Sequence, residues 1–188
     1  MQKIGVLALQ GGYDPHLRML SGLKVEAYPV KTLAEIDAVQ GLILPGGEST
    51  TIGKLLVLQG LFSPLIERIK AGLPVFGTCA GLILLSKNAL GSSQPLLEVL
   101  DVDVQRNAYG RQIESFETQV ELLWGTQAQS SAIFIRAPQI VRLGDSVKVL
   151  ARHEGRPVAI QQGKILAASY HPELTENTAL HQLFLSLV

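Results

Sequence analysis

Cysteine is nearly absent from this chain, with one residue in 188, so no disulfide can form within it. An excess of charge of one sign is also missing, because 16 lysine and arginine residues balance 16 aspartate and glutamate residues. A chain without such an excess has no broad field that attracts nucleic acid or an anionic membrane surface. We therefore expect its partner to be a small molecule or another protein, and we expect neither nucleic acid nor a membrane.

Long apolar runs and metal-ligand spacings are missing as well. No run reaches the ~20 residues of a membrane-spanning helix, and no signal-type segment precedes the first apolar run, so we expect a cytoplasmic protein. The single cysteine and four scattered histidines show none of the spacings of a zinc site, so we predict no metal, and we expect no cofactor. With 47% hydrophobic residues, the chain is sized for one globular domain, residues 1–188.

The apolar runs of the first half are continuous rather than alternating. Residues 4–9, 41–45 and 74–76 each lead into a glycine-containing segment, and such runs are typical of parallel strands covered on both faces. Residues 25–30 predict a further strand. Between these strands we expect helices at 15–20 with Asp14 as N-cap, from the Thr32 capping box toward Gly41, at 52–58, and from a cap at Ser63 to Gly72.

The second half has short strand-like segments separated by turn residues. They are predicted at 100–104, 116–123, 132–135, 147–151, 158–161 and 165–168, paired as antiparallel hairpins with a tight turn at 162–163. A closing helix is expected at about 177–187. These patterns predict an α/β fold with a doubly wound, mostly parallel first half flanked by helices and a strand-rich second half.

The single cysteine lies in a segment typical of a nucleophile elbow. Gly77-Thr78-Cys79-Ala80-Gly81 follows a buried strand and leads into a helical pattern, and the glycines permit the sharp bend that such an elbow needs. At the amino end of a helix, the dipole favours a thiolate over a thiol. The alternative is an ordinary buried cysteine, since free cysteine is among the most buried residue types.

A cysteine nucleophile needs a base and a group that orients the base. His171 follows the strand expected at 165–168, and Glu173, two residues on, lies where it can hold the imidazole, so we predict a triad of Cys79, His171 and Glu173. The alternative is that His171 is an ordinary histidine in a surface loop. We expect no chemical role for His16 and His181, because no rigid turn ties either to a carboxylate, and we expect His153 to be solvated.

Acyl transfer also needs donors for the oxyanion. Gly46 and Gly47 lie at a strand-to-helix turn, and the Ala80 N–H follows the nucleophile, so we predict these three as the oxyanion site. A glycine pair also allows its peptide to switch orientation. A phosphate loop is the competing interpretation, but the lysine of a Walker-type loop is missing. Glu48 and Ser49 are then expected to line the substrate pocket.

Six motifs in order along the chain resemble the class I, triad-type glutamine amidotransferases, and within them the glutaminase subunits of pyridoxal 5′-phosphate synthase. They are Ile4-Gly5-Val6-Leu7-Ala8-Leu9-Gln10-Gly11, Leu44-Pro45-Gly46-Gly47-Glu48-Ser49-Thr50-Thr51, Phe76-Gly77-Thr78-Cys79-Ala80-Gly81-Leu82, Arg106-Asn107-Ala108-Tyr109-Gly110-Arg111-Gln112, Phe134-Ile135-Arg136-Ala137-Pro138 and His171-Pro172-Glu173-Leu174-Thr175.

The resemblance implies the three-layer, flavodoxin-like fold of the class I amidotransferases, with a mostly parallel central sheet. It also implies hydrolysis of L-glutamine to L-glutamate and ammonia through a thioester on Cys79. His171 is implied as base and then acid, and Glu173 as the residue that orients it. Glutamine-binding residues are implied at Gly47, Glu48, Ser49, Arg106, Ile135 and Arg136. The two arginines are suited to a substrate carboxylate, with a structural salt bridge as the alternative.

The resemblance also implies a partner, a synthase subunit that receives the ammonia and makes pyridoxal 5′-phosphate, with Gln10 and Gly11 in the region of the interface and of activation. The chain departs from the family at Asp14-Pro15-His16, where a Glu-His pair is common. Two alternatives stay open. One is an amidotransferase subunit or hydrolase of another pathway, and the other is a non-catalytic binding protein of the same fold.

Overall fold

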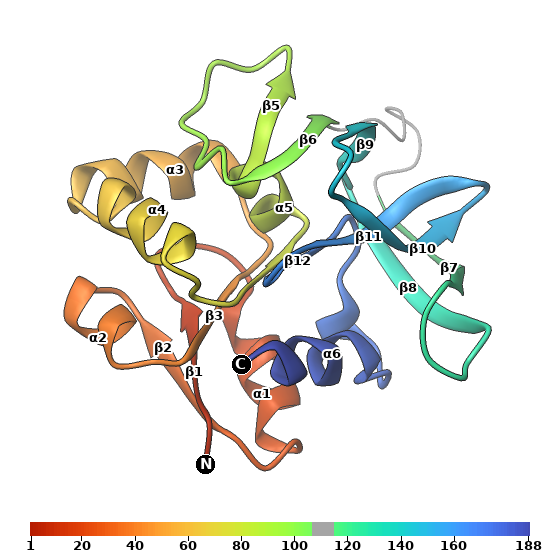
Figure 1. Cartoon of the computed structure of the whole chain (residues 1–188), viewed down its shortest axis with the longest axis horizontal. Helices are drawn as coiled ribbons and strands as arrows, with labels where there is room; N and C mark the ends of the chain where they lie inside the picture. Colours follow the sequence, from red (N-terminus) through yellow and green to blue (C-terminus); the bar gives the residue numbers. More distant parts are fainter. Residues whose placement is uncertain (107–114) are drawn as a thin grey trace.

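The computed structural model describes residues 1–106 and 115–188 (Figure 1). The predicted α/β fold is confirmed. Its first half alternates strands and helices in chain order: β1 Lys3–Leu7, α1 Tyr13–Ser21, β2 Glu26–Val30, α2 Leu33–Asp37, β3 Gly41–Leu44, α3 Ser49–Leu58, α4 Phe62–Lys70, β4 Val75–Thr78 and α5 Ala80–Leu85.

The second half is rich in strands, as expected, and ends in helices. Its elements are β5 Ser86–Leu90, β6 Leu100–Gln105, β7 Ser115–Leu122, β8 Gln129–Ile135, β9 Gln139–Leu143, β10 Lys148–His153, β11 Arg156–Gln162, β12 Ile165–Ala168, the 3₁₀ helix η1 Pro172–Leu174 and α6 Ala179–Leu187. Of the motif at 106–112, only Arg106 belongs to the described residues.

One sheet joins the two halves. Its strand order is β2-β1-β3-β4-β12-β11-β10-β7-β8, parallel from β2 to β12 and antiparallel from β12 to β8. The last strand of the chain, β12, therefore lies beside β4, with Ala168 opposite Thr78. Because parallel strands end at the same edge, the loops after β4 and β12 emerge together. This pairing brings residues 79 and 171 to one rim.

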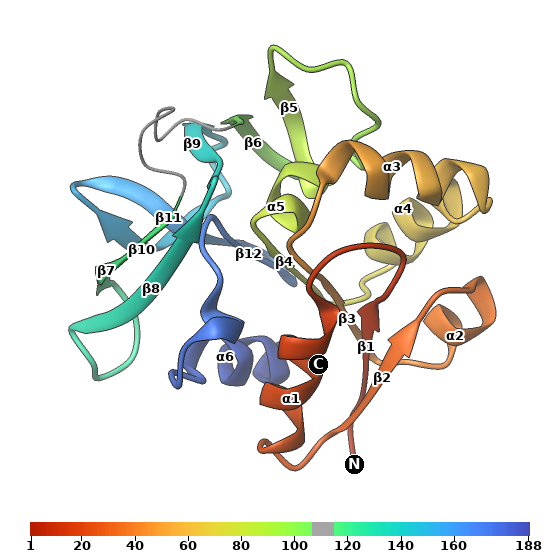
Figure 2. The same ribbon diagram turned by 180° about the vertical axis from the view of Figure 1, so that it is seen from behind.

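Helices cover both faces of the parallel part of the sheet. On one face α3, α4 and α5 bury a cluster that includes Leu44, Leu56 and Leu84. On the other, α1 and α6 lie side by side (Figures 1 and 2) and bury Phe76 and Phe184. Full burial of one such side chain contributes about 2 kcal/mol to folding. The two faces explain why the β1, β3 and β4 runs are continuously apolar rather than alternating.

A smaller sheet, β5-β6-β9, was only partly predicted. The strand at 100–104 is β6, but it pairs in parallel with β5 and antiparallel with β9, not in a hairpin. Neither β5, with its polar Ser-Lys-Asn start, nor β9 has an apolar run long enough to predict a strand.

Three predicted helix starts were wrong, although the helices exist. The helix α1 begins at Tyr13 with Gly12 as N-cap, so Asp14 lies in the first turn, where its charge suits the helix dipole. The helix α3 begins at Ser49, three residues early, because the Glu48 side chain caps it. Ser63 lies inside α4, which starts after Leu61. The Thr32 capping box was correct.

Within the described residues, no single helix has the length and apolar character to cross a membrane. The bent pair α3 and α4 passes that test jointly, with a 99° angle at its break.

Candidate active site

The bend after β4 is held in a conformation that few side chains adopt. Cys79 has φ 49° and ψ −100°, and it is buried at the start of α5. A Cβ on Gly81 would lie 2.0 Å from the Leu44 carbonyl oxygen, so the helix packs against β3 only because residue 81 is glycine. The Cys79 thiol faces the Ile135 carbonyl, with 3.7 Å between sulfur and oxygen.

The second arm of the site is the loop after β12. The His171 N–H donates to the Ile133 carbonyl of β8 at 2.8 Å, which ties this loop to the antiparallel half. The His171 Nδ1 lies 2.7 Å from Oε1 of Glu173, whose side chain is almost fully buried. This distance is that of a charge-assisted hydrogen bond, with the Nδ1–H donating to the carboxylate.

The electrostatics of this arm favour an ion pair. Burial acts to lower the pKa of His171, but hydrogen bonds to Cys79 and Glu173 outweigh it and raise the pKa to about 10. Burial acts to raise the pKa of Glu173, but its interactions with His16 and His171 outweigh this and lower it. At neutral pH, Glu173 is therefore a carboxylate and His171 holds a proton, which it can give to a leaving amide nitrogen.

The glycine loop after β3 lies against His171. A Cβ on Gly46 would be 2.4 Å from Cε1 of the imidazole. The Gly46 carbonyl accepts from the Gly12 N–H at 2.9 Å, and since no peptide bond of the described residues is cis, the Gly47 N–H points the opposite way, away from Gly12. Ala80 contributes the first amide of α5, which has no partner within the helix.

Gln10 and Gly11 lie behind this loop rather than in the cavity wall. The Gln10 Oε1 accepts from the Glu48 N–H at 2.9 Å, and a Cβ on Gly11 would be 2.1 Å from the Gly46 oxygen. The loop at 10–12 therefore sets the position of the loop at 46–48.

A cavity of about 470 Å³ opens above the thiol. It is lined by most of the predicted site residues, together with others that sequence reasoning did not select. The predicted residues are Gly46, Gly47, Glu48, Ser49, Cys79, Arg106, Ile135, Arg136, His171 and Glu173, and the additional ones are Gly12, Pro15, Ile83 and Leu174.

Arg106 is held across the cavity wall. Its guanidinium donates to Glu48 Oε1 at 3.1 Å and to Gln94 Oε1 at 2.9 Å, so it joins the end of β6 to the start of α3. Ser49 Oγ also donates to Gln94, at 3.0 Å. Arg106 thus forms an ion pair, but this pair ties β6 to α3 and lines the cavity, whereas the alternative was a salt bridge that steadies the strand-rich half. Gln94 was missed because nothing in its sequence context distinguishes it.

Two histidines for which no chemical role was expected lie next to the site. His16 and His181 are fully buried, 2.9 Å apart between His16 Nδ1 and His181 Nε2. His16 Nε2 lies 3.5 Å from Glu173 Oε2. Helical spacing is the sequence signal that could have predicted the burial of His181, because this residue shares the buried face of α6 with Leu180 and Phe184. His153, expected to be solvated, is partly buried against the rings of Phe116 and Phe134.

The arrangement can perform nucleophilic acyl transfer. A comparison with known protein families shows to which family the chain belongs. The model of the SNO glutamine amidotransferase family matches residues 6–188. The chain belongs to this family.

Family relatives match over nearly their whole length. "Pyridoxal 5′-phosphate synthase subunit PdxT" of Thermotoga neapolitana is 53% identical, covering 99% of each chain, and that of Desulforamulus reducens is 48% identical, covering 98% of each. A crystal structure of a glutamine amidotransferase superposes with TM-score 0.93 at 48% identity, covering 98% of this chain and 97% of that one.

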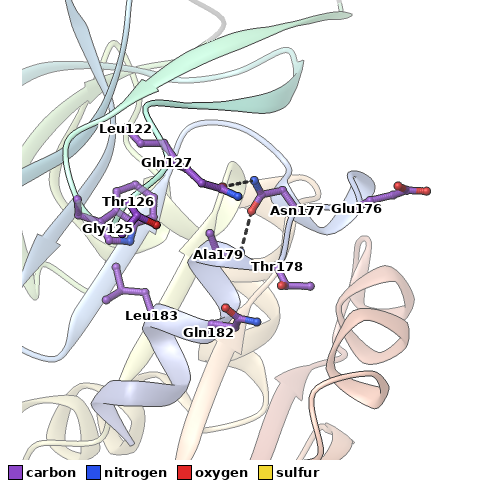
Figure 3. Close-up of a pocket in the computed structure, with 11 residues that line it drawn as sticks. Leu122, Gly125, Thr126, Gln127, Glu176, Asn177, Thr178, Ala179, Gln182 and Leu183 are labelled. Carbon is purple, nitrogen blue, oxygen red and sulfur yellow. Dashed lines mark hydrogen bonds between the residues drawn. The ribbon is translucent and has the colours of Figure 1, made fainter.

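This family member also has a larger cavity, of about 770 Å³, away from the triad. It lies between the β7–β8 turn and the start of α6 (Figure 3), where Asn177 Nδ2 donates to Gln127 Oε1 at 3.4 Å. It contains neither Cys79 nor His171. Within residues 1–106 and 115–188, no group of three or more histidine, cysteine or acidic residues is placed to hold a metal ion.

Proposed function

We propose that this chain is the glutaminase subunit of pyridoxal 5′-phosphate synthase and hydrolyses L-glutamine to L-glutamate and ammonia. Family membership and the relatives named above support the activity and the pathway. The contact of His171 with Glu173, and the cavity that Cys79 and His171 both line, support the mechanism. Residues 1–188 act as one glutaminase domain, because one sheet joins both halves and the family model covers 6–188.

The reaction begins when the Cys79 sulfur, whose proton passes to His171, attacks the side-chain amide carbon of glutamine. The oxyanion that forms accepts hydrogen bonds from the N–H groups of Gly47 and Ala80, beside Gly46. The His171 imidazolium gives its proton to the amide nitrogen, the C–N bond breaks, and ammonia leaves a thioester on Cys79. His171 then takes a proton from water, which attacks the thioester and releases glutamate. Glu173 orients His171 throughout.

Substrate binding is assigned to the cavity walls. Glu48 and Ser49 at the start of α3, with Gly47, form one wall, and Ile135 and Arg136 at the end of β8 form the other. Arg106 is suited to the substrate carboxylate, since a guanidinium binds a carboxylate through two parallel hydrogen bonds. Because Glu48 already pairs with Arg106, glutamine binding requires the two to share or exchange this contact.

The ammonia passes to a synthase subunit in a cytoplasmic hetero-oligomer. The relatives' printed name, a subunit of pyridoxal 5′-phosphate synthase, supports this partner. The contacts of Gln10 and Gly11 with the loop at 46–48 give docking a direct route to the oxyanion site. No resident cofactor takes part in the proposed steps, and neither nucleic acid nor a membrane is involved.

The test measures ammonia and glutamate released from glutamine, with and without a synthase subunit. We expect release to rise on adding the synthase and to disappear in Cys79→Ala. Sustained release by Cys79→Ala would remove the nucleophile assignment. Release that does not respond to the synthase, together with capture of a different channel-forming subunit, would favour an amidotransferase of another pathway.

A further inference from the structure

A buried pair of histidines joins the triad to two helices on the other side of the sheet. His16 of α1 and His181 of α6 are both fully buried, and His16 Nδ1 lies 2.9 Å from His181 Nε2. The other ring nitrogen of His16 faces the site. It lies 3.1 Å from the Thr78 Oγ1 and 3.5 Å from the Glu173 Oε2. His16 therefore contacts the neighbour of the nucleophile and the carboxylate that orients the base.

Polar groups in a dry interior must find partners, and this decides the tautomers. If His16 carried its proton on Nδ1, its Nε2 lone pair would face the Glu173 carboxylate, and His181 would need its own proton on Nδ1. That atom is buried and has no hydrogen-bond partner among the described residues. An unpaired buried donor costs about 1 to 3 kcal/mol. With the protons on Nε2 of both rings, the His181 N–H meets His16 Nδ1, and the His16 N–H meets Thr78 Oγ1 at 3.1 Å while facing Glu173 Oε2 at 3.5 Å.

Burial keeps both rings neutral. Desolvation lowers the pKa of His16, against the opposing effect of Glu173, and it lowers the pKa of His181 well below its usual value. The titratable groups that face the pair are Glu173 and His171 in the loop after β12, with Cys79 beyond them. A neutral His16 with its proton on Nε2 presents a fixed dipole to Glu173 Oε2, the oxygen that His171 does not use.

We propose that His16 is a positioning residue of the glutaminase site: its Nε2–H holds the Glu173 carboxylate against His171, and His181 fixes the tautomer in which it can do so. This inference rests on the proposed function, because the triad it supports is the one assigned there. His16 acts through Glu173 and does not touch the substrate. The separation of 3.5 Å is longer than an ordinary hydrogen bond, so the contact is mainly electrostatic.

The kinetic test compares His16→Leu, His16→Gln and the control His153→Gln in the complex with the synthase. Leucine fills the space without a donor, whereas the glutamine amide reaches the region of Nε2. We expect His16→Leu to lower kcat for glutamine about 10-fold, because the Glu173 carboxylate loses the dipole that faces it, with KM within about 2-fold. We expect His16→Gln to restore most of kcat and His153→Gln to leave it unchanged.

The pH profile separates positioning from a loss of packing. A Glu173 that is poorly held supports the His171 proton less, so in His16→Leu the alkaline limb of kcat/KM moves to lower pH than the limb near pH 10 expected of the parent. An unchanged limb and kcat in His16→Leu would overturn the proposal. So would a kcat for His16→Gln as low as that of His16→Leu.

A spectroscopic measurement needs no variant and no turnover. In the ¹⁵N-labelled chain, we expect His16 to be neutral with its proton on Nε2 at neutral and alkaline pH, and a proton on Nδ1 or a charged ring there would overturn the proposal. The proposed function and the proposed role of His16 can be contradicted separately. A wrong function leaves the parent unable to hydrolyse glutamine, whereas a wrong role for His16 leaves the parent active and His16→Leu equally active.

Discussion

Two strand-to-helix junctions of the same sheet edge differ in what their N-cap residues do. At the β3–α3 junction the Glu48 carboxylate accepts from the backbone N–H groups of Thr50 and Thr51, at 3.2 and 2.8 Å. At the β4–α5 junction the Cys79 side chain makes no capping bond, and its φ of 49° lies in the left-handed region. One junction stabilises its helix, and the other presents its side chain to the cavity.

The difference shows how a fold separates stability from chemistry. Glu48 has an ordinary extended conformation, with φ −100°, and uses its side chain to pair helix amides and Arg106. Cys79 is strained, and strain of this kind costs about 1 to 3 kcal/mol. Tight packing around Gly81 and the pairing of β4 with β12 offset that cost. A side chain that does not cap remains available for attack.

Replacing each of the two N-cap residues, Cys79 and Glu48, by alanine should give the largest contrast in activity. We expect Cys79→Ala to lower kcat for glutamine hydrolysis by about 10³-fold or more, because no other group replaces the sulfur. Glu48→Ala should mainly raise KM, because it removes a cavity wall and frees Arg106. Steady-state ammonia release measures both. Equal losses of kcat in the two variants would break the distinction.

Packing behind the elbow should dominate its stability. We expect Gly81→Ala to lower the free energy of unfolding by about 3 kcal/mol or more, because its Cβ would lie 2.0 Å from the Leu44 oxygen and backbone cannot yield easily. Gly22→Ala is the control, since its Cβ meets nothing closer than 3.6 Å. Urea unfolding measures both, and a Gly81→Ala chain as stable as Gly22→Ala would contradict the geometry.

The cap at the other junction should have a smaller effect. We expect Glu48→Ala to lower the free energy of unfolding by about 1 kcal/mol, the usual value of a lost N-cap. Glu67→Ala, an exposed change in α4, should stay within about 0.5 kcal/mol of the parent. If thermal and urea unfolding show no difference between these variants, Glu48 does not stabilise α3.

The smallest expected effect concerns strain at the elbow itself. Glycine adopts a positive φ without strain, so Cys79→Gly should be about 1 kcal/mol more stable than Cys79→Ala, despite the larger backbone entropy of unfolded glycine. The neighbouring exchange, Ala80→Gly, should instead destabilise by about 1 kcal/mol, because residue 80 is helical. A Cys79→Gly chain less stable than Cys79→Ala would show that the elbow stores no strain.

The sequence was most informative about features that a few neighbouring residues determine. Continuous apolar runs predicted β1, β3 and β4, and the glycines around residue 79 predicted the bend. The segment Ser169-Tyr170-His171-Pro172-Glu173 was enough to predict that His171 lies beside the carboxylate of Glu173, because the two residues are only two positions apart. These are short-range features that the chain encodes within a few positions.

Long-range contacts explain what the sequence did not reveal. The His16–His181 contact joins residues 165 positions apart, and each histidine looks ordinary on its own helix. Gln94, which accepts a hydrogen bond from Arg106, lies in a loop whose sequence has no regular pattern. The pairing of β5 with β6 depends on the same loop, which returns the chain in the parallel sense. No local pattern carries such information.

Mass spectrometry after treatment with a glutamine analogue that carries a chloroketone in place of the amide tests the central claim most directly. The chain has one cysteine, so any thiol adduct is unambiguous. We predict one adduct per chain, on Cys79, formed more slowly in Glu173→Gln and blocked by excess glutamine. No adduct in the presence of the synthase, or an adduct on another residue, would contradict the assignment of residue 79 as the nucleophile.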